Sequence, residues 1–212
     1  DWVGIDPMGI KTASASDKLY IQEGFETINL HFKREARFYG SIIFDGGTFY
    51  GNSRTTTDNN LWVTKLKFGN ISGGNTPTDR HSSTGYLCKK MIHYLSSVPD
   101  NSDQFTQHRY AFPIIRLADL YLMYAEALNE ANFDKNKSTV LKYLNDIRKR
   151  AGIPGYGEQG LAVPSTQEEM REVIRRERRV ELGFEEARYF DCIRWGVAHQ
   201  YFNGPKHGMN VN

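Results

Sequence analysis

Two glutamates fall on the apolar face of a helix that the sequence predicts after residue 166. At about 100° per residue, the apolar side chains of this helix share one sector. They are Met170, Val173, Ile174, Val180 and Phe184. Glu177 and Glu181 lie in the middle of that sector. Like charges one turn apart repel by about 0.2–0.5 kcal/mol on a surface, and by more away from water. The helix therefore has to pack where cations reach both carboxylates.

Arginines are the candidates for those cations. Arg188 falls in the same sector if the helix continues past Gly183, and Arg148 and Arg194 lie in neighbouring predicted helices. Three interpretations are open: a solvated helix face, a partly buried Arg–Glu network that locks helices together, or a catalytic carboxylate pair. We prefer the network, because nothing near these residues in the sequence resembles a substrate pocket.

The composition excludes several classes of protein. Lys and Arg number 27 against 25 Asp and Glu, so the net charge of +2 gives no strong field for nucleic acid or a membrane surface. No run of about 18 apolar residues predicts a membrane span. Cys88 and Cys192 form no CxxC or metal-ligand spacing, and Cys192 is expected to be buried among aromatic residues.

The C-terminal half, 114–212, carries strongly helical patterns. Hydrophobic periodicity and capping residues predict helices at about 117–131, at 138–151, after a cap at Ser165 or Thr166, and at about 185–201. They are expected to form two antiparallel, TPR-like pairs, each burying its apolar stripe against the next. Repeats of this kind need about three units for stability. Either the N-terminal half supplies the missing surface, or the chain is incomplete.

The N-terminal half, 1–113, is rich in Gly, Ser, Thr and Asn, with short aromatic and β-branched pieces between turn signals. The pieces 38–44 and 48–50 flank Asp45-Gly46-Gly47 and predict a small hairpin. A helix over 17–34 is also expected from its loosely spaced apolar residues. The expected fold class is therefore mainly α. TPR-like helical hairpins at 114–212 pack with a loop-rich region at 1–113, both as parts of one domain.

Five segments carry a resemblance to a known family. They are REARFY at 34–39, TGYLCKK at 84–90, IRLADLYLMYAEA at 115–127, NDIRKRAG at 145–152 and ERRVELGFEEARYFDCIRW at 177–195. In this order they resemble motifs of the SusD/RagB family, which are outer-membrane nutrient-binding lipoproteins of Bacteroidetes. Two departures occur: Glu35-Ala36 replaces the usual Asp-Pro, and Glu186 stands where the family often has Gly. The ordered set is more specific than any one segment.

The resemblance implies a SusD-like fold and a role in polysaccharide utilisation. Family members are usually much longer, so this chain is expected to be a C-terminal portion, with a lipid-bearing cysteine upstream of Asp1. The implied function is non-enzymatic capture of an oligosaccharide or other nutrient at the cell surface. Its ligand would pass to a SusC-like, TonB-dependent transporter in the outer membrane. Membrane attachment would come only through the lipid anchor, which this chain lacks, and no cofactor or nucleic acid is implied.

Binding in such a protein would rest on flat aromatic faces against sugar rings and on polar side chains. Trp62 follows two asparagines in a polar stretch and is suited to that role. Tyr50, with Asn52 and Arg54 nearby, has a similar case. For both aromatic residues, the alternative is a hydrophobic anchor beneath a long loop.

Other patterns count against an enzyme or a metal site. The six histidines show no metal-ligand spacing, and no nucleotide-binding or nucleophile motif occurs. Glu185 and Glu186 are adjacent on a predicted helix and do not face each other as glycosidase carboxylates would. The arginines at 175–179 alternate with glutamates and are interpreted as a solvated face. The alternative function is a helical-repeat scaffold that binds protein partners without saccharide.

Overall fold

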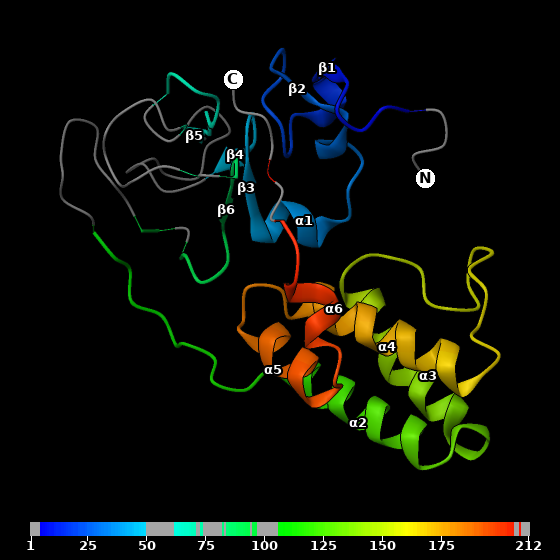
Figure 1. Cartoon of the computed structure of the whole chain (residues 1–212). Coiled ribbons are helices and arrows are strands. Elements are labelled where there is room, and N and C mark those ends of the chain that lie inside the picture. The colour runs from blue at the N-terminus through cyan, green and yellow to red at the C-terminus, as the bar shows by residue number, and fades with distance from the viewer. Residues whose placement is uncertain are drawn as a thin grey trace. The chain divides into compact units, whose positions relative to one another are not determined.

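A computed structural model describes residues 5–49, 62–70, 73, 82, 84–93, 95–96, 106–205 and 208. These residues divide into two compact units (Figure 1). One unit contains the described residues of 1–34, 38–112 and 205–212, and the other contains 35–37 and 113–204. The first contains mainly short strands and turns, and the second is mainly helical.

The helical unit contains the helices Leu117–Ala131 (α2), Phe133–Arg150 (α3), Gln167–Glu181 (α4), Ala187–Arg194 (α5) and Ala198–Phe202 (α6). α2 and α3 form a hairpin around Asn132, which ends α2 and begins α3. The Asn132 side chain accepts a hydrogen bond from the Lys135 N–H at 3.0 Å, which satisfies one of the open donors of the first turn. The predicted start of this helix at Ser138 is therefore wrong.

α4 packs against both α2 and α3 (Figure 1). Thr166 caps its N-terminus, because the Thr166 hydroxyl accepts a hydrogen bond from the Glu169 N–H at 3.1 Å. The apolar stripes of the three helices meet in one core. Its buried residues include Leu122, Ala125, Val140, Leu144, Ile147, Met170, Val173, Ile174 and Leu182. Burying one Leu, Ile, Val or Met side chain contributes about 1.5–3 kcal/mol, so this core holds the helices together.

The chain leaves the helical path between α4 and α5. Phe184 (φ 65°) and Glu186 (φ 62°) both adopt the left-handed conformation. L-residues enter that region at a cost of roughly 1–2 kcal/mol. Gly196 (φ 70°) then ends α5 before α6 begins. The predicted single helix over 185–201 is therefore wrong, because a left-handed glycine divides it into two short helices.

The other unit contains three two-stranded antiparallel sheets within its described residues. The pairs are Ile10–Thr12 (β1) with Glu26–Ile28 (β2), Ile42–Phe44 (β3) with Tyr86–Cys88 (β6), and Thr48–Phe49 (β4) with Trp62–Val63 (β5). Short 3-10 turns cover Ala15–Asp17 (η1) and Asn29–His31 (η2), and the helix Ala36–Ser41 (α1) leads into β3. A small core buries Ala13, Ile21, Phe32, Tyr39 and Phe44.

Two predictions for this unit are wrong. The expected helix over 17–34 is replaced by turns and β2. The expected hairpin around Asp45 does not form, since β3 pairs with β6. The Asp45 carboxylate instead accepts the Leu66 N–H at 2.8 Å, and the Gly46 N–H donates to the Thr64 carbonyl at 2.8 Å. The turn residues are thus satisfied by a segment distant in the sequence.

The mainly α fold class is confirmed. Cys88 and Cys192 are both free thiols, and Cys192 is buried as expected. Among the described residues, none of the helices combines the length and the hydropathy of a membrane span. Those same residues contain no group of three or more His, Cys, Asp and Glu that fits a metal ion.

Candidate functional site

Trp62, a predicted ligand-binding residue, lies on β5 directly opposite Phe49 of β4. The two ring centres are 6.3 Å apart and the rings meet edge to face, while 42% of Trp62 stays exposed. Lys89 supports this pair, with Nζ 5.5 Å from the centre of the Phe49 ring. Its ammonium also donates to the carbonyls of Tyr39 and Thr48 at 3.1 Å each. Burial lowers the pKa of Lys89. The Trp62 ring is therefore held by a neighbouring aromatic residue and still has a large surface accessible to solvent.

The other predicted ligand-binding residues, Tyr50, Asn52 and Arg54, lie outside the described residues. They follow β4 closely in the sequence, since Phe49 is the last residue of that strand. Their part in ligand binding stays a prediction.

Glu177 is buried on α4, and each of its carboxylate oxygens contacts an arginine. Oε1 accepts a hydrogen bond from Arg37 Nη1 at 2.6 Å, and Oε2 accepts one from Arg148 Nη1 at 3.1 Å. Arg148 is itself held in place, because its Nε donates to the Pro154 carbonyl at 2.9 Å. Its guanidinium also lies 4.6 Å from the centre of the Tyr156 ring. Arg148 was a predicted member of this network, whereas Arg37 was not.

Glu181, one turn later, is only 2% exposed and receives three arginines. Its Oε1 accepts from Arg116 Nη1 at 3.0 Å and from Arg150 Nη2 at 2.6 Å. Its Oε2 accepts from Arg37 Nη1 at 3.2 Å. Arg116 also holds Glu185 through two hydrogen bonds of 2.7 and 2.8 Å. Its Nη2 donates to the Glu181 main-chain carbonyl at 3.2 Å, which satisfies an open acceptor at the end of α4.

The shared guanidinium of Arg37 offsets the repulsion between the two carboxylates. Burial disfavours its charged form, yet the hydrogen bond to Glu35 and the attraction of Glu177 raise the pKa of Arg37 above its usual range. All four carboxylate oxygens of Glu177 and Glu181 accept guanidinium hydrogen bonds. A general base needs an oxygen that reaches a substrate proton. This arrangement instead ties α4 to Arg37, α3 and the residue before α2.

Arg188 and Arg194 do not join this network, contrary to the prediction. None of the ion pairs between described residues links either of them to Glu177 or Glu181. The guanidinium of Arg188 lies 4.2 Å from the centre of the Tyr201 ring. The physical reason is the break between α4 and α5, which ends the helical face before it reaches Arg188.

A second charge network, which the sequence did not predict, centres on Arg178. Arg178 is buried and donates to both carboxylate oxygens of the buried Asp191 on α5, at 2.9 and 3.1 Å. Its Nη1 also donates to Asp119 on α2 at 2.9 Å. Arg194 contacts Asp191 at 2.9 Å and holds Glu126 on α2 through bonds of 2.6 and 2.7 Å. The network therefore joins α2, α4 and α5.

Only some of the residues in these two networks could have been identified from the sequence. Arg178 follows the buried Ile174 by four positions, so it lies on the same side of α4 and needs a buried partner. No local pattern identifies Arg37 or Arg116, because their contacts with Glu181 span 144 and 65 positions.

Comparison with known proteins gives a consistent result. The SusD family model matches residues 5–212. SusD-like protein P25 of Formosa agariphila is 38% identical over 105 residues, which cover 46% of this chain and 18% of that protein. A SusD-like protein of Bacteroides ovatus is 37% identical over 82 residues, covering 39% of this chain and 13% of the other.

Solved structures share the fold. The structure of BT4246 superposes with a TM-score of 0.66 at 28% identity, covering 90% of this chain and 31% of that one. A SusD-like protein from Bacteroides fragilis NCTC 9343 gives 0.65 at 25% identity, covering 93% and 32%. The chain thus spans under a third of the length of these structures, and its match spans under a fifth of the curated relatives. The resemblance seen in the sequence is confirmed, and the chain belongs to the SusD family.

Proposed function

We propose that this chain is part of a non-enzymatic, surface-exposed subunit that binds a glycan or another nutrient and delivers it to a TonB-dependent transporter of the outer membrane. Membership of the SusD family supports the outer-membrane setting, the lipid anchor and the SusC-like partner. We also propose that both units belong to one SusD-like domain.

The exposed ring of Trp62 is the observation that supports saccharide binding. A sugar presents C–H groups to an aromatic face, and an indole with an accessible surface offers the largest such face among side chains. Trp62 contacts the Phe49 ring edge to face, and Lys89 lies over that Phe49 ring. These contacts restrain the strand that bears Trp62. A restrained ring loses little conformational entropy on binding.

The carboxylates of the helical unit favour binding over catalysis. Glu177 and Glu181 are the pair that most resembles an acid–base couple in the sequence, and each is occupied by arginines. If the protein were a glycoside hydrolase, it would turn over chromogenic glycosides, and Glu181→Gln would abolish that turnover. We expect no turnover in either protein.

Calorimetric titration of the full-length protein with neutral oligosaccharides tests the proposal. We expect Trp62→Ala to weaken binding at least about fivefold, since stacking of a planar ligand on one aromatic ring is worth roughly 1–3 kcal/mol. Phe68→Ala is the matched control, because Phe68 is also an exposed aromatic residue of the same unit. Equal affinity in Trp62→Ala and the unsubstituted protein would contradict a role for this ring.

The second candidate function is a helical scaffold for protein partners. The observation in its favour is the set of apolar side chains exposed on α2 and α5: Leu117, Leu120, Tyr124, Tyr189, Phe190 and Ile193. Apolar side chains that gather into a large exposed patch mark interaction sites. Tight binding of a transporter or peptide, with no binding of any saccharide, would favour this function over the first.

A further inference from the structure

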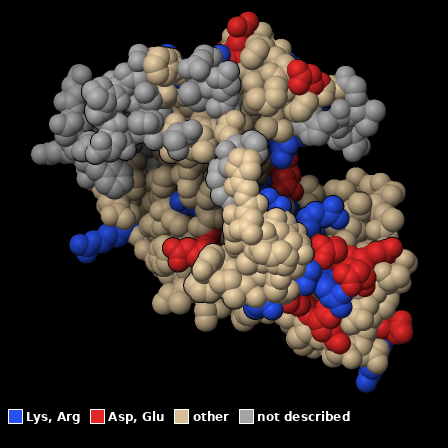
Figure 2. Space-filling model, viewed as in Figure 1, with Lys and Arg blue, Asp and Glu red and all other residues tan. Residues whose placement is uncertain are grey.

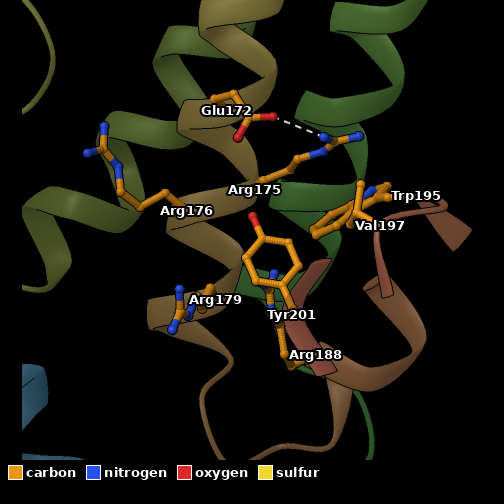
Figure 3. A pocket seen from close by; sticks show the side chains of 8 residues that line it. All are labelled: Glu172, Arg175, Arg176, Arg179, Arg188, Trp195, Val197 and Tyr201. Atoms are coloured by element: carbon orange, nitrogen blue, oxygen red, sulfur yellow. Dashed lines mark hydrogen bonds and ion pairs between the residues drawn. The ribbon is translucent and has the colours of Figure 1, made fainter. Parts of the chain in front are cut away.

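A pocket of about 140 Å³ opens between α4 and the α5–α6 segment of the helical unit. Its lining residues are Glu172, Arg175, Arg176, Arg179, Arg188, Trp195, Val197 and Tyr201 (Figure 3). Figure 3 shows Tyr201 between Arg175 and Arg179, with Arg188 behind its ring, whereas Arg176 extends away from Trp195. Four arginines and one glutamate thus line this small concavity, and the Arg176 guanidinium points away from it.

The charges of this pocket are less balanced than the sequence indicated. Acidic and basic side chains are interspersed over the visible face of the helical unit (Figure 2). The alternating glutamates that were expected to cancel the arginines at 175–179 include Glu177 and Glu181, which are buried and engaged by other arginines. Only Glu172 lies in the pocket, paired with Arg175 at 2.9 Å.

Among the described residues, the remaining guanidinium groups of the pocket have no carboxylate partner. Arg176, Arg179 and Arg188 form no ion pair with any residue that the structure describes. By contrast, Arg171 and Arg178 of the same helix pair with acidic residues of other helices. The pocket therefore gathers positive charge that no acidic side chain among the described residues pairs with.

One donor in the pocket is also buried without an acceptor. Arg175 Nε is inaccessible to solvent and has no hydrogen-bond partner among the described residues. A buried donor in this state is unfavourable, because it has lost its hydrogen bond to water without gaining another. An oxyanion that enters the pocket adds acceptor oxygens beside this guanidinium and lowers the electrostatic cost of the whole cluster.

The aromatic walls hold the cations in place. The Arg175 guanidinium lies 4.9 Å from the centre of the Trp195 ring, and that of Arg188 lies 4.2 Å from the Tyr201 ring. Trp195 Nε1 donates to Glu126 at 2.7 Å, which fixes the indole. Because guanidinium groups contact both rings, this pocket is suited to a charged group rather than to stacking of a neutral sugar.

We propose that the pocket formed by Arg175, Arg179, Arg188, Trp195 and Tyr201 binds an oxyanion, either a carboxylate or a sulfate group. Arginine forks match both geometries through charge-assisted hydrogen bonds. The group enters as a free inorganic anion or as a substituent of an acidic sugar. This site is separate from Trp62 and does not depend on the function proposed above.

Titration followed by NMR of the tryptophan indole N–H signals tests the site. Sulfate, glucuronate and glucose are added to the protein, with chloride adjusted to keep the ionic strength constant, and Trp195→Phe assigns the reporting signal. We expect sulfate or glucuronate to shift the Trp195 signal and leave that of Trp62 unchanged, while glucose shifts neither. A shift with sulfate alone identifies a free inorganic anion as the ligand. A shift with glucuronate at lower concentration than with acetate, titrated in the same way, identifies an acidic sugar.

Substitutions of single arginines and of a pair test which side chains bind the anion. Arg179→Gln combined with Arg188→Gln should weaken anion binding at least about tenfold, the ratio that corresponds to one lost charge-assisted hydrogen bond. Arg171→Gln is the matched control, since it removes the same charge from the same helix outside the pocket, and its affinity should stay within about twofold. Arg179→Gln alone removes an exposed side chain without an ion pair, so it tests the site if the double variant does not fold. Absence of any saturable shift, or equal affinity in these variants and the unsubstituted protein, overturns the proposal.

Discussion

Arg178 and Asp191 form a two-bond ion pair in which both side chains are almost completely removed from solvent, at 4% exposure each. The pair crosses the break that separates α4 from α5. Asp119 and Arg194 complete its hydrogen bonding, so the charges are compensated on both sides. Buried pairs are weak contributors to stability when intact, yet removal of one partner leaves a buried charge alone.

We expect Asp191→Asn to destabilise the helical unit by roughly 3–5 kcal/mol, since it keeps the shape of the side chain but leaves the Arg178 charge without its main partner. Urea unfolding followed by circular dichroism measures this loss. Asp146→Asn is the control, because Asp146 makes an exposed pair with Lys142 and its loss should leave the unfolding midpoint almost unchanged. Equal midpoints for the two variants would show that the buried pair has no such role.

Glu181→Ala should destabilise the unit by roughly 3–5 kcal/mol, because Arg37, Arg116 and Arg150 would lose a common acceptor in a buried setting. Glu168→Ala, which removes a mostly exposed carboxylate from the same helix, should cost less than about 1 kcal/mol. Chemical denaturation of both variants gives the comparison. A cost for Glu181→Ala below about 0.5 kcal/mol would mean that solvent replaces the glutamate.

His31 makes the strand unit sensitive to acid. Its Nδ1 is 2.7 Å from Thr27 Oγ1, whose hydroxyl donates to the Asp45 carbonyl, and its Nε2 is 3.1 Å from the Tyr86 hydroxyl. These partners suit a neutral ring that donates from Nδ1 and accepts at Nε2. Burial, with a smaller contribution from the charge of Arg34, lowers the pKa of His31 from 6.5 to about 4.

The pH dependence follows from that shift. Between pH about 4 and 6.5 the unfolded chain binds the proton and the folded chain does not, so folding stability rises with pH across this window. The stability is fully present above pH 6.5 and is lost as pH falls, by roughly 3 kcal/mol at pH 4. Unfolding free energies of the unsubstituted protein and His31→Gln, measured from pH 4 to 7.5, check it. His199→Gln, which alters an exposed histidine on α6, should leave the slope unchanged.

Glu186→Gly should raise stability by about 0.5–1 kcal/mol, because glycine adopts the φ of 62° without the steric cost that glutamate bears. Glu186→Ala retains a Cβ and should bring no gain. Thermal unfolding of the three proteins distinguishes relief of strain from a simple loss of charge, since only the latter predicts the same change in both variants.

The parts of the fold that could be predicted from the sequence are those set by neighbouring residues. α2 and α4 follow their apolar periodicity, and Thr166 caps α4 as a residue of that type does. The strand pairing could not be predicted, because Ile43 meets Leu87 through contacts distant in the sequence. Short strands of two or three residues carry no periodicity that would reveal their partners.

The charged residues show the same division. The burial of Glu177 and Glu181 follows from their position on α4, whereas Arg37 and Arg116 become their neighbours only in the folded chain. Along the sequence, the arginines and glutamates of α4 are interspersed, which suggested that their charges cancel. Around the helix axis, however, they lie on different sides. Glu177 and Glu181 are buried and pair with arginines, whereas Arg175, Arg176 and Arg179 line the pocket.

The Arg116 contact at the end of α4 also bears on the order in which the unit assembles. The α2–α3 hairpin needs only near neighbours, so it closes early with little loss of chain entropy. The Arg116–Glu181 bond spans 65 positions and forms only after α4 has docked. Weakening that bond with Arg116→Gln should therefore speed unfolding while leaving the refolding rate almost unchanged. In this unit the residues that set the lifetime of the native state differ from those that set the speed of reaching it.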